Sequence, residues 1–380
     1  MKIGIDCRKF YDVANNRGAG IERYTYHLVK SLLIKDKTND YVLFFYTDIS
    51  PDTVQKVKSH NPRVKIVKLF RATSMIPLYD THIKIAMAMR KEKLDWHIFP
   101  ANAMPLFFKP KKSLLIVHDL AIYLHPEWFP ERQWLSTKIV VPRSIKKATK
   151  IVTVSKNTKD DVVGIFNTKS EKVHAVYPGV IIKDDYLPEE IDKVRKKYDI
   201  SEKYLLFLGT IEPRKNIVNL IKAFSNYSFD NEESRVTLIL AGIKGWKFQP
   251  IFQELQEINQ RLIGGKIKYI GQVSNRERNI LIKNCQAFVF PSQYEGFGFP
   301  VVEAMALGVP VVTGNNSSLK EIAENAALLV DPNDINDIRN AIRQIVSDKY
   351  LRNHLVLKGK ERIKKFTWED AVNKIIGLLD

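Results

Sequence analysis

The feature that most constrains the fold of this chain is a regular alternation of short apolar runs with longer amphipathic stretches. Residues 21–36 and 133–148 are two of the amphipathic stretches, and both show helical periodicity. Strands that alternate with helices predict βαβ units around a parallel sheet. The apolar, strand-like runs of the first half are 2–6, 41–46, 64–69, 96–101, 113–120, 150–155 and 172–179.

The pattern restarts after Pro178 and Gly179, which predicts a second unit of the same kind. The charged segment 183–203 lies where a linker is expected, and 367–380 is an amphipathic helix with Thr367 as its N-cap. The second unit has expected strands at 204–210, 236–242, 267–272, 287–292, 309–314 and 327–332, and expected helices at 216–227, up to about 260, 274–285, 300–307, 318–325 and 334–347.

We therefore predict an α/β protein with two Rossmann-like domains that face each other. Residues 1–182 would form the first domain, 183–203 the linker region and 204–366 the second domain. Ligands of such sheets bind at the carboxyl ends of the strands. The cleft between the two domains is therefore the expected binding site.

Composition excludes several classes of protein. The chain is 45% hydrophobic and 27% charged, as globular proteins are, and no stretch approaches the roughly 18 apolar residues of a membrane-spanning helix. The first ten residues lack the apolar core of a signal peptide. Cys7 and Cys285 both lie in apolar runs, so we expect buried free thiols and a reducing, cytoplasmic location. No Cys/His cluster has metal-ligand spacing.

The net charge of +18 is distributed unevenly along the chain. Residues 1–180 hold 31 Lys and Arg against 16 Asp and Glu, whereas the other 200 residues hold 29 against 26. A basic first half suits a nucleic acid, an anionic membrane surface or a phosphorylated substrate. The alternative is that a lysine-rich composition reflects the source genome. A nucleic-acid partner has no further support, because the chain shows no helix-turn-helix, zinc or RNA-binding signature.

Two glutamates, Glu295 and Glu303, flank a glycine-rich apolar loop within "PSQYEGFGFPVVEAMALG". We expect Glu295 on the loop that follows a buried strand, and Glu303 on the first turn of helix 300–307. Bare backbone N–H groups beside a helix N-terminus favour anions and hydroxyl-rich ligands. Glu303 could accept hydrogen bonds from the two hydroxyls of a ribose, and Glu295 from a sugar hydroxyl. The alternative is that both acids are solvated. That alternative leaves the Gly-Phe-Gly-Phe-Pro sequence between them unexplained.

The segment "GTIEPRKNI" (209–217) directly follows the apolar part, 204–208, of an expected strand. Gly209 ends that strand, and Arg214 and Lys215 precede a helix for which Asn216 is the expected N-cap. An Arg fork, a Lys charge and a helix N-terminus make a diphosphate clamp. A surface basic pair is the alternative.

Two further motifs lie in the first half. Gly18 and Gly20 in "NNRGAGIERY" open a helix and could approach a phosphate, but Arg23 stands where a dinucleotide-binding fingerprint needs glycine. This counts against an NAD-dependent oxidoreductase. His118 and Asp119 end the strand in "VHDL", where His118 could bond a sugar hydroxyl or a leaving phosphate. A histidine that only caps the next loop is the alternative.

Together these segments resemble the retaining GT-B glycosyltransferases of glycosyltransferase family 4, in family order and across nearly the whole chain. The stretch 317–332 looks most like mannosyltransferases of bacterial polysaccharide assembly. The resemblance implies a GT-B fold whose second domain holds a nucleotide-diphosphate sugar, whose first domain binds the acceptor, and whose final helix 367–380 crosses back to the first domain.

The resemblance also implies roles for individual residues. The donor-binding residues would be Gly18, Gly20, Gly209, Val273, Glu295, Gly296, Phe297, Gly298 and Glu303. The catalytic residues would be His118, Arg214, Lys215 and Glu295. Within these sets Glu303 would hold the ribose, Arg214 and Lys215 the diphosphate, and the backbone at Val273 the nucleobase. The loop here is Gly-Ala-Gly after a bulky Arg17, which departs from the family pattern.

The implied reaction is the transfer of a hexose, mannose favoured, from a nucleotide-diphosphate sugar, GDP-mannose favoured, to a glycan or lipid-linked acceptor. Retention by front-face transfer is expected, with the leaving phosphate helping to deprotonate the acceptor. No D-x-D motif stands at a strand end, so we expect no metal or other cofactor. The alternatives are a UDP-sugar-dependent transferase of the same fold and a GT-B epimerase.

A lipid-linked acceptor would bring the basic first domain to the inner face of a membrane, as a peripheral protein. We therefore expect binding to anionic vesicles that weakens as salt is added, because salt screens surface charge. Co-sedimentation with vesicles of defined composition measures this. Equal binding to neutral and anionic vesicles would contradict an electrostatic partner.

Overall fold

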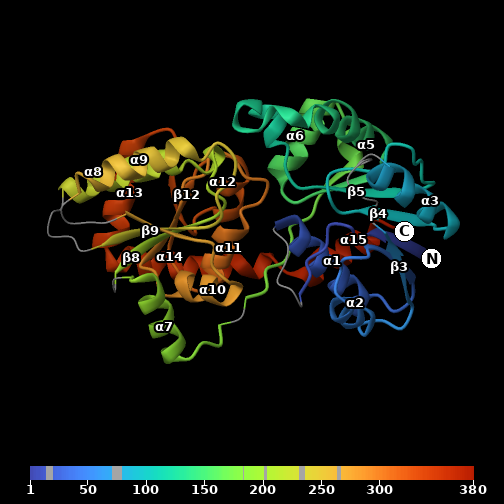
Figure 1. Cartoon of the computed structure of the whole chain (residues 1–380), viewed down its shortest axis with the longest axis horizontal. Helices are drawn as coiled ribbons and strands as arrows, with labels where there is room; N and C mark the ends of the chain where they lie inside the picture. Colours follow the sequence, from blue (N-terminus) through green and yellow to red (C-terminus); the bar gives the residue numbers. More distant parts are fainter. Residues whose placement is uncertain (14–19, 71–78, 183, 201–202, 231–235, 263–266) are drawn as a thin grey trace. The chain divides into compact units, whose positions relative to one another are not determined.

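The computed structural model of the chain (Figure 1) describes residues 1–13, 20–70, 79–182, 184–200, 203–230, 236–262 and 267–380. It contains two compact units, each with its own parallel sheet. The predicted α/β class with two Rossmann-like domains is thus confirmed. The first unit comprises Met1–Tyr123, Glu131–Gly179 and Phe366–Asp380, and the second Leu124–Pro130 and Val180–Lys365.

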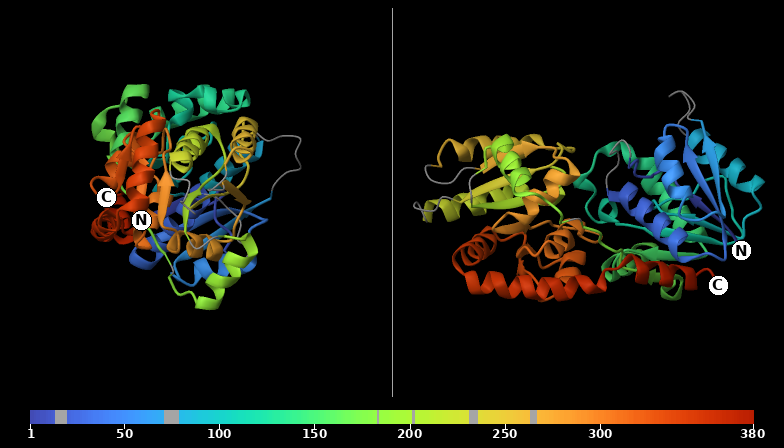
Figure 2. Two further views of the ribbon diagram at one scale, coloured as in Figure 1. Left: turned by 90° about the vertical axis from the view of Figure 1, so that its left-hand side faces the viewer. Right: turned by 90° about the horizontal axis from the view of Figure 1, so that it is seen from below.

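The sheet of the first unit has seven described strands in the order β3-β2-β1-β4-β5-β6-β7, and every neighbouring pair is parallel. Its central strands β4 and β5 are buried along their whole length, because helices cover both faces (Figure 2). The strands are β1 (Lys2–Asp6), β2 (Asp40–Tyr46), β3 (Val64–Leu69), β4 (Trp96–Phe99), β5 (Ser113–Val117), β6 (Lys150–Thr153) and β7 (Val173–Ala175). The main helices are α1 (Gly20–Lys35), α2 (Pro51–Lys58), α3 (Ile85–Lys91), α5 (Val141–Lys147), α6 (Lys156–Phe166) and α15 (Trp368–Gly377).

The second sheet has six described strands in the order β10-β9-β8-β11-β12-β13, again all parallel. Stacked aromatic rings of Phe207, Phe288 and Phe290 lie in its core. The strands are β8 (Tyr204–Leu208), β9 (Thr237–Ala241), β10 (Ile267–Gly271), β11 (Ala287–Phe290), β12 (Val311–Gly314) and β13 (Leu328–Val330). The helices are α7 (Pro188–Tyr198), α8 (Ile217–Asp230), α9 (Gln249–Asn259), α10 (Asn275–Lys283), α11 (Phe299–Ala306), α12 (Ser317–Ala323), α13 (Ile335–Ser347) and α14 (Lys349–Arg362).

Two predicted segments differ in the structure. The expected helix 133–148 is broken into short pieces, and a π-helix, Ser136–Val140, precedes α5. Pro142 supplies no backbone N–H at this junction. The helical hydrogen bond there spans five residues, from the Val141 N–H to the Ser136 carbonyl. The expected linker 183–203 contains helix α7, which packs against α10 through ion pairs such as Lys197 with Glu277.

The final helix α15 lies on the first unit, beside α1. Trp368 at its start stacks on His27, with 5.8 Å between ring centroids, and meets the Tyr24 ring edge-on. Thr367 caps the helix as predicted, because its side chain accepts from the Asp370 N–H at 3.1 Å. Glycine is required at position 179, because a Cβ on Gly179 would lie 2.1 Å from the backbone nitrogen of Trp368.

Each sheet reverses its strand order at one point. In the first sheet the reversal lies between β1 and β4, and in the second between β8 and β11. The loops that leave the carboxyl ends of two such strands run in opposite directions and leave a crevice, where ligands of open α/β sheets bind. The fold therefore points to two places, one in each unit, at which to look for functional side chains.

Candidate functional site

The strand-order reversal of the second sheet brings together three of the predicted residues. Arg214 and Lys215 lie on a 3₁₀ turn, Pro213–Lys215, that follows β8. Glu295 lies on the loop between β11 and α11. The turn and the loop are joined directly, because the Gln293 N–H donates to the Arg214 carbonyl at 2.9 Å. The structure thus brings the predicted diphosphate clamp and the first glutamate of the pair into one cluster.

Glu295 is the centre of this cluster. Its Oε1 accepts from Lys215 Nζ at 2.6 Å and from Ser292 Oγ at 2.7 Å. Its Oε2 lies 3.5 Å from a terminal nitrogen of Arg214. The Arg214 guanidinium also donates through Nε and Nη2 to one oxygen of Glu212, both at 3.1 Å. Sequence reasoning missed Glu212 and Ser292, although Glu212 stands two residues before Arg214 in the same motif.

The ion pairs of Glu295 are buried, and this affects the pKa of each partner. Glu295 is only 7% exposed and Lys215 8%. Burial would raise the pKa of the Glu295 carboxyl, but the charges of Lys215 and Arg214 outweigh it and hold that pKa below its usual value. Burial, with Arg214 alongside, lowers the pKa of the Lys215 ammonium. A pair of this kind persists because either charge alone would be costly in the interior.

The cluster is electrically balanced as it stands. Two cations, Arg214 and Lys215, face two carboxylates, Glu212 and Glu295. Arg214 has the most accessible side chain of the four, at 14% exposed. An anionic ligand would therefore meet Arg214 first and would have to share both cations with their internal carboxylates.

The glycine-rich loop is held close to the cluster. The Glu295 N–H donates to Ser317 Oγ at 3.1 Å, and Ser318 Oγ donates to the Glu295 carbonyl at 2.8 Å. Gly298 has φ +97° and is the N-cap of α11, and a Cβ there would lie 2.8 Å from Leu319. Glycine is needed at Gly298 for both reasons. Gly296 and Phe297 are buried beside it.

Glu303 lies apart from this cluster, on the second turn of α11 and not on the first turn as predicted. The helix begins at Phe299, one residue earlier than expected, which moves Glu303 away from its N-terminus. Arg278 of α10 donates to Glu303 Oε1 at 3.0 Å, while Oε2 is buried and accepts no hydrogen bond from the described residues. Val273 lies just before α10, so both predicted nucleoside contacts adjoin that helix. Sequence reasoning missed Arg278, whose charge reads as one of a solvated helical run.

The remaining predicted residues belong to other loops. Gly209 follows β8, and its N–H donates to the Ala241 carbonyl at 3.0 Å. His118 follows β5 of the first unit and is buried, with Nε2 2.7 Å from the Pro100 carbonyl. Burial lowers the pKa of His118, so its imidazole is neutral near pH 7. Gly20 is the first residue of α1. Gly18 lies outside the described residues.

Within the part of the chain that the structure describes, no group of three or more His, Cys, Asp or Glu residues could hold a metal ion. Cys7 and Cys285 are both buried free thiols. Burial raises the pKa of each thiol above its usual value. Buried cysteines of this kind are not nucleophiles at neutral pH.

Comparison with known proteins identifies the two halves of the chain. Residues 18–183 match the family model described as Glycosyltransferase Family 4, and residues 190–362 match the model described as Glycosyl transferases group 1. O-antigen chain mannosyltransferase B of Escherichia coli is 30% identical over 366 residues, which cover 94% of each protein.

Solved structures show the same fold. Alr3699/HepE of Anabaena, solved in complex with UDP and glucose, superposes with a TM-score of 0.75 at 18% identity and covers 100% of this chain and 99% of its own. Sucrose-phosphate synthase of Thermosynechococcus elongatus gives a TM-score of 0.73 at 20% identity, covering 99% and 98%.

The ion pair of Glu295 predicts a defined pH dependence of stability. Because the folded-state pKa of Glu295 is lowered, its contribution is complete above the ordinary value of 4.5 and is lost as the pH falls through the folded value. We expect Glu295→Gln to lower the free energy of unfolding by about 3 kcal/mol at pH 7, with the deficit shrinking below pH 4.5. Urea unfolding between pH 7 and pH 3 measures this.

Glu361→Gln is the matched control for that experiment, because Glu361 forms an ion pair with Lys364 whose side chains are about 70% exposed. Exposed pairs contribute little, so this variant should unfold like the parent at every pH. A deficit for Glu295→Gln that stays constant down to pH 3 would show that the carboxylate charge is not what stabilises the site.

Proposed function

We propose a specific reaction for this chain, which belongs to the GT-B glycosyltransferases that combine a family 4 domain with a group 1 domain. The enzyme transfers a hexose, with mannose favoured, from a nucleotide-diphosphate sugar, with GDP-mannose favoured, to a glycan or lipid-linked acceptor, and retains the anomeric configuration. The observation that carries the proposal is the buried cluster of Arg214, Lys215 and Glu295 at the strand-order reversal of the second sheet. The similarity to an O-antigen mannosyltransferase supports the choice of mannose.

The donor diphosphate would bind at Arg214 and Lys215. The guanidinium presents a planar fork of donors to phosphate oxygens, and the ammonium adds a point charge. Glu212 and Glu295 hold both cations in place before the donor arrives, so little rearrangement is required on binding. As the bond to the sugar breaks, negative charge grows on the diphosphate, and fixed cations stabilise that charge most.

Glu295 is poorly placed to act as a nucleophile. Each of its oxygens already faces a cation, and Oε1 also accepts from Ser292. A double displacement would need a free carboxylate at the anomeric carbon. Front-face transfer fits better: the acceptor oxygen bonds to the anomeric carbon, the bond to the diphosphate breaks, and the acceptor proton passes to the leaving phosphate.

His118 would assist by binding and not by protonation. Its Nε2 faces a carbonyl oxygen, which can only accept, so Nε2 carries the proton and Nδ1 is an acceptor. A neutral imidazole with a lowered pKa does not donate a proton to a phosphate near pH 7. The proposed role is therefore to accept a hydrogen bond from a donor-sugar hydroxyl.

The nucleoside would bind beside α10 and α11. Glu303 offers carboxylate oxygens to the ribose hydroxyls, and Arg278 fixes the orientation of that carboxylate. The backbone at Val273 precedes α10 and would line the nucleobase. Gly18, Gly20, Gly209 and the 296–298 loop would provide close backbone approach to the phosphates and the sugar.

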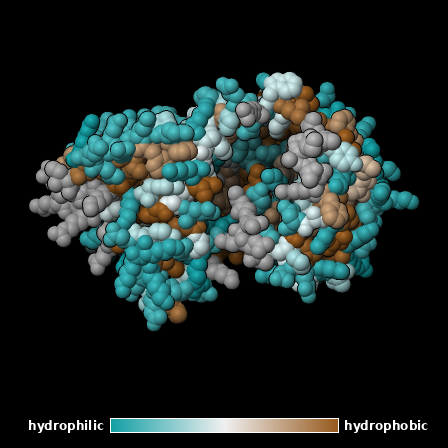
Figure 3. Space-filling model, viewed as in Figure 1, coloured by the Kyte–Doolittle hydropathy of each residue, from teal (hydrophilic) through white to brown (hydrophobic). Residues whose placement is uncertain are grey.

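No cofactor is proposed, and the cations that replace a metal ion are Arg214 and Lys215. The peripheral membrane partner stays a prediction. Among the described residues, no helix combines the length and the apolar character that crossing a bilayer requires. Hydrophilic side chains, teal in Figure 3, cover much of the surface seen in that view.

Removing both cations should abolish the reaction. Because each makes contacts that strengthen as the diphosphate departs, the double variant Arg214→Ala/Lys215→Ala should lose at least about 10³-fold in kcat/KM. Arg214→Lys, which keeps the charge but not the fork, should lose an intermediate amount. Lys222→Ala is the control, since Lys222 lies on α8 with its side chain 42% exposed. Donor turnover measures these effects, with circular dichroism to verify folding, and full activity in the double variant would exclude the clamp.

A panel of nucleotide sugars tests the donor and the reaction type together. GDP-mannose should raise the melting temperature more than UDP- or ADP-sugars do, because the ligand that binds the folded state most tightly stabilises it most at a given concentration. The transferred mannose should have the donor's anomeric configuration by NMR, and EDTA should leave the rate unchanged. Selective stabilisation by a UDP-sugar would favour the UDP-dependent alternative, and conversion of the donor without any acceptor would indicate an epimerase.

A further inference from the structure

Among the predicted catalytic residues, His118 is the one that lies in the first unit, and a neighbouring loop holds it at two atoms. It follows β5 and is only 8% exposed. Its Nε2 donates to the Pro100 carbonyl at 2.7 Å, and its backbone N–H donates to Asn102 Oδ1, also at 2.7 Å. Both partners belong to loop 100–105, which follows β4. These bonds fix the backbone of His118 and one nitrogen of its ring.

Asn102 connects the ends of two neighbouring strands. Its own N–H donates to the Ile116 carbonyl of β5 at 3.0 Å, while its side chain accepts from the His118 N–H. Its φ of +59° lies in the left-handed region, which asparagine adopts more readily than most other residues do. Asn102 therefore joins the loop after β4 to the end of β5 twice, once through its backbone and once through its side chain.

The ring of Tyr24 restrains the imidazole of His118 from another direction. The two ring centroids are 4.7 Å apart, and the ring planes are at 89° to each other. This arrangement is attractive because the positive edge of one ring meets the negative face of the other. The χ2 torsion of histidine has a broad preference, so a hydrogen bond at one nitrogen restrains the ring plane only weakly. Contact with Tyr24 supplies a second restraint on that plane.

Tyr24 is itself held firmly. It lies on α1, is 2% exposed and meets Trp368 of α15 edge-on, with 5.3 Å between ring centroids. The far end of α15 is also anchored on the first unit, because Lys150 Nζ donates to the Leu378 carbonyl at 2.6 Å. The final helix thus supports the ring that contacts His118.

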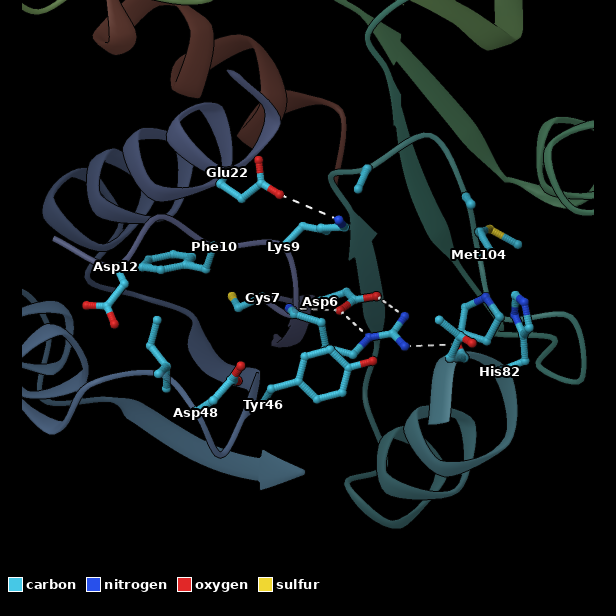
Figure 4. A pocket seen from close by; sticks show the side chains of 16 residues that line it. Asp6, Cys7, Lys9, Phe10, Asp12, Glu22, Tyr46, Asp48, His82 and Met104 are labelled. Carbon is cyan, nitrogen blue, oxygen red and sulfur yellow. Dashed lines mark hydrogen bonds and ion pairs between the residues drawn. The ribbon is translucent and has the colours of Figure 1, made fainter. Parts of the chain in front are cut away.

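A cavity of about 380 Å³ lies at the strand-order reversal of the first sheet (Figure 4). Residues that follow β1, β2 and β4 line it. Arg8 in its lining is bound to Asp6 by two hydrogen bonds, from Nε to Oδ1 at 2.9 Å and from Nη2 to Oδ2 at 2.7 Å. A bidentate pair of this kind fixes the part of the wall that follows β1.

The loop that holds His118 also lines this cavity. Ala101 and Ala103 are lining residues, and they alternate along the chain with Pro100 and Asn102, which contact His118. One short loop therefore shapes the cavity and positions the histidine, so a displacement of Asn102 would also displace His118.

We propose that Asn102 and Tyr24 are positioning residues for the transfer reaction and act through His118. Asn102 sets the position of the strand end that carries His118, and Tyr24 sets the plane of its imidazole. With the ring held in this way, Nδ1 stays available to accept a hydrogen bond from a donor-sugar hydroxyl. The proposal rests on the glycosyltransferase function proposed above.

Imidazole NMR tests the positioning without any substrate. In protein labelled with ¹⁵N-histidine, His118→Ala identifies the His118 signals, which should show a protonated Nε2 and an unprotonated Nδ1. Tyr24→Phe keeps the ring and should leave these signals unchanged, whereas Tyr24→Leu should shift them. Asn102→Gly should also shift them, because glycine accepts the positive φ but lacks the side chain. Wild-type signals in both Tyr24→Leu and Asn102→Gly would overturn the proposal.

A double-mutant cycle tests whether both residues act through His118. With the donor selected by the nucleotide-sugar panel, Tyr24→Leu and Asn102→Gly should each lower kcat/KM by roughly 10- to 100-fold, because small misplacements near the reacting atoms cost this much. In a His118→Ala background each should cost less than about 2-fold more, since residues that act through one group are not additive. Losses of equal size in both backgrounds would overturn the proposal. Asn102→Gly keeps the test decisive if the buried ring of Tyr24 cannot be replaced.

Phe108→Leu is the matched control. Phe108 is 5% exposed and lies edge-on to another histidine of the first unit, His97 of β4, with 5.0 Å between ring centroids. Its removal should leave the His118 signals and kcat/KM as in wild type, and a loss equal to that of Tyr24→Leu would contradict the assignment. If the wild type uses no nucleotide sugar, the function proposed above is refuted, whereas the NMR measurement still decides whether Tyr24 and Asn102 hold His118.

Discussion

The reversal of strand order in each sheet is the constraint on which both candidate sites depend. Right-handed crossovers carry the chain to one side of an opening strand and then back to the other. As a result, β1 and β8 each lie between strands that the chain reaches in opposite directions. The crevice beside β8 holds Arg214, Lys215 and Glu295, and the crevice beside β1 holds the cavity around Arg8. The two units thus repeat one architectural solution with different chemistry.

Both crevices neutralise their own cations, because a buried charge without a partner costs several kcal/mol. Lys215 is paired with Glu295, and Arg8 with Asp6. The cluster in the second unit is electrically balanced, and in the proposed function its two cations would be shared between the internal carboxylates and a diphosphate.

Much of the fold and part of the site could be predicted from the sequence. Apolar runs located the thirteen described strands, since a buried parallel strand is apolar on both faces. Contacts between residues that are distant in the sequence could not be predicted. Residues 183–203 look like a linker because α7 is charged, yet its charges pair with α10. Arg278 could not be singled out from the sequence, because its partner Glu303 is 25 positions away.

The sequence by itself determined the α/β class, the restart near Gly179 and the residue types at the strand ends, because these depend on local periodicity and on turn chemistry. Only the tertiary structure decided which charges meet. Lys215 and Glu295 are 80 residues apart, and they pair because β8 and β11 are hydrogen-bonded neighbours. No local pattern encodes that adjacency. Two separate motifs, one with Arg214 and Lys215 and one with Glu295, therefore meet in one buried, balanced cluster, since free energy in the interior depends on the whole set of neighbours.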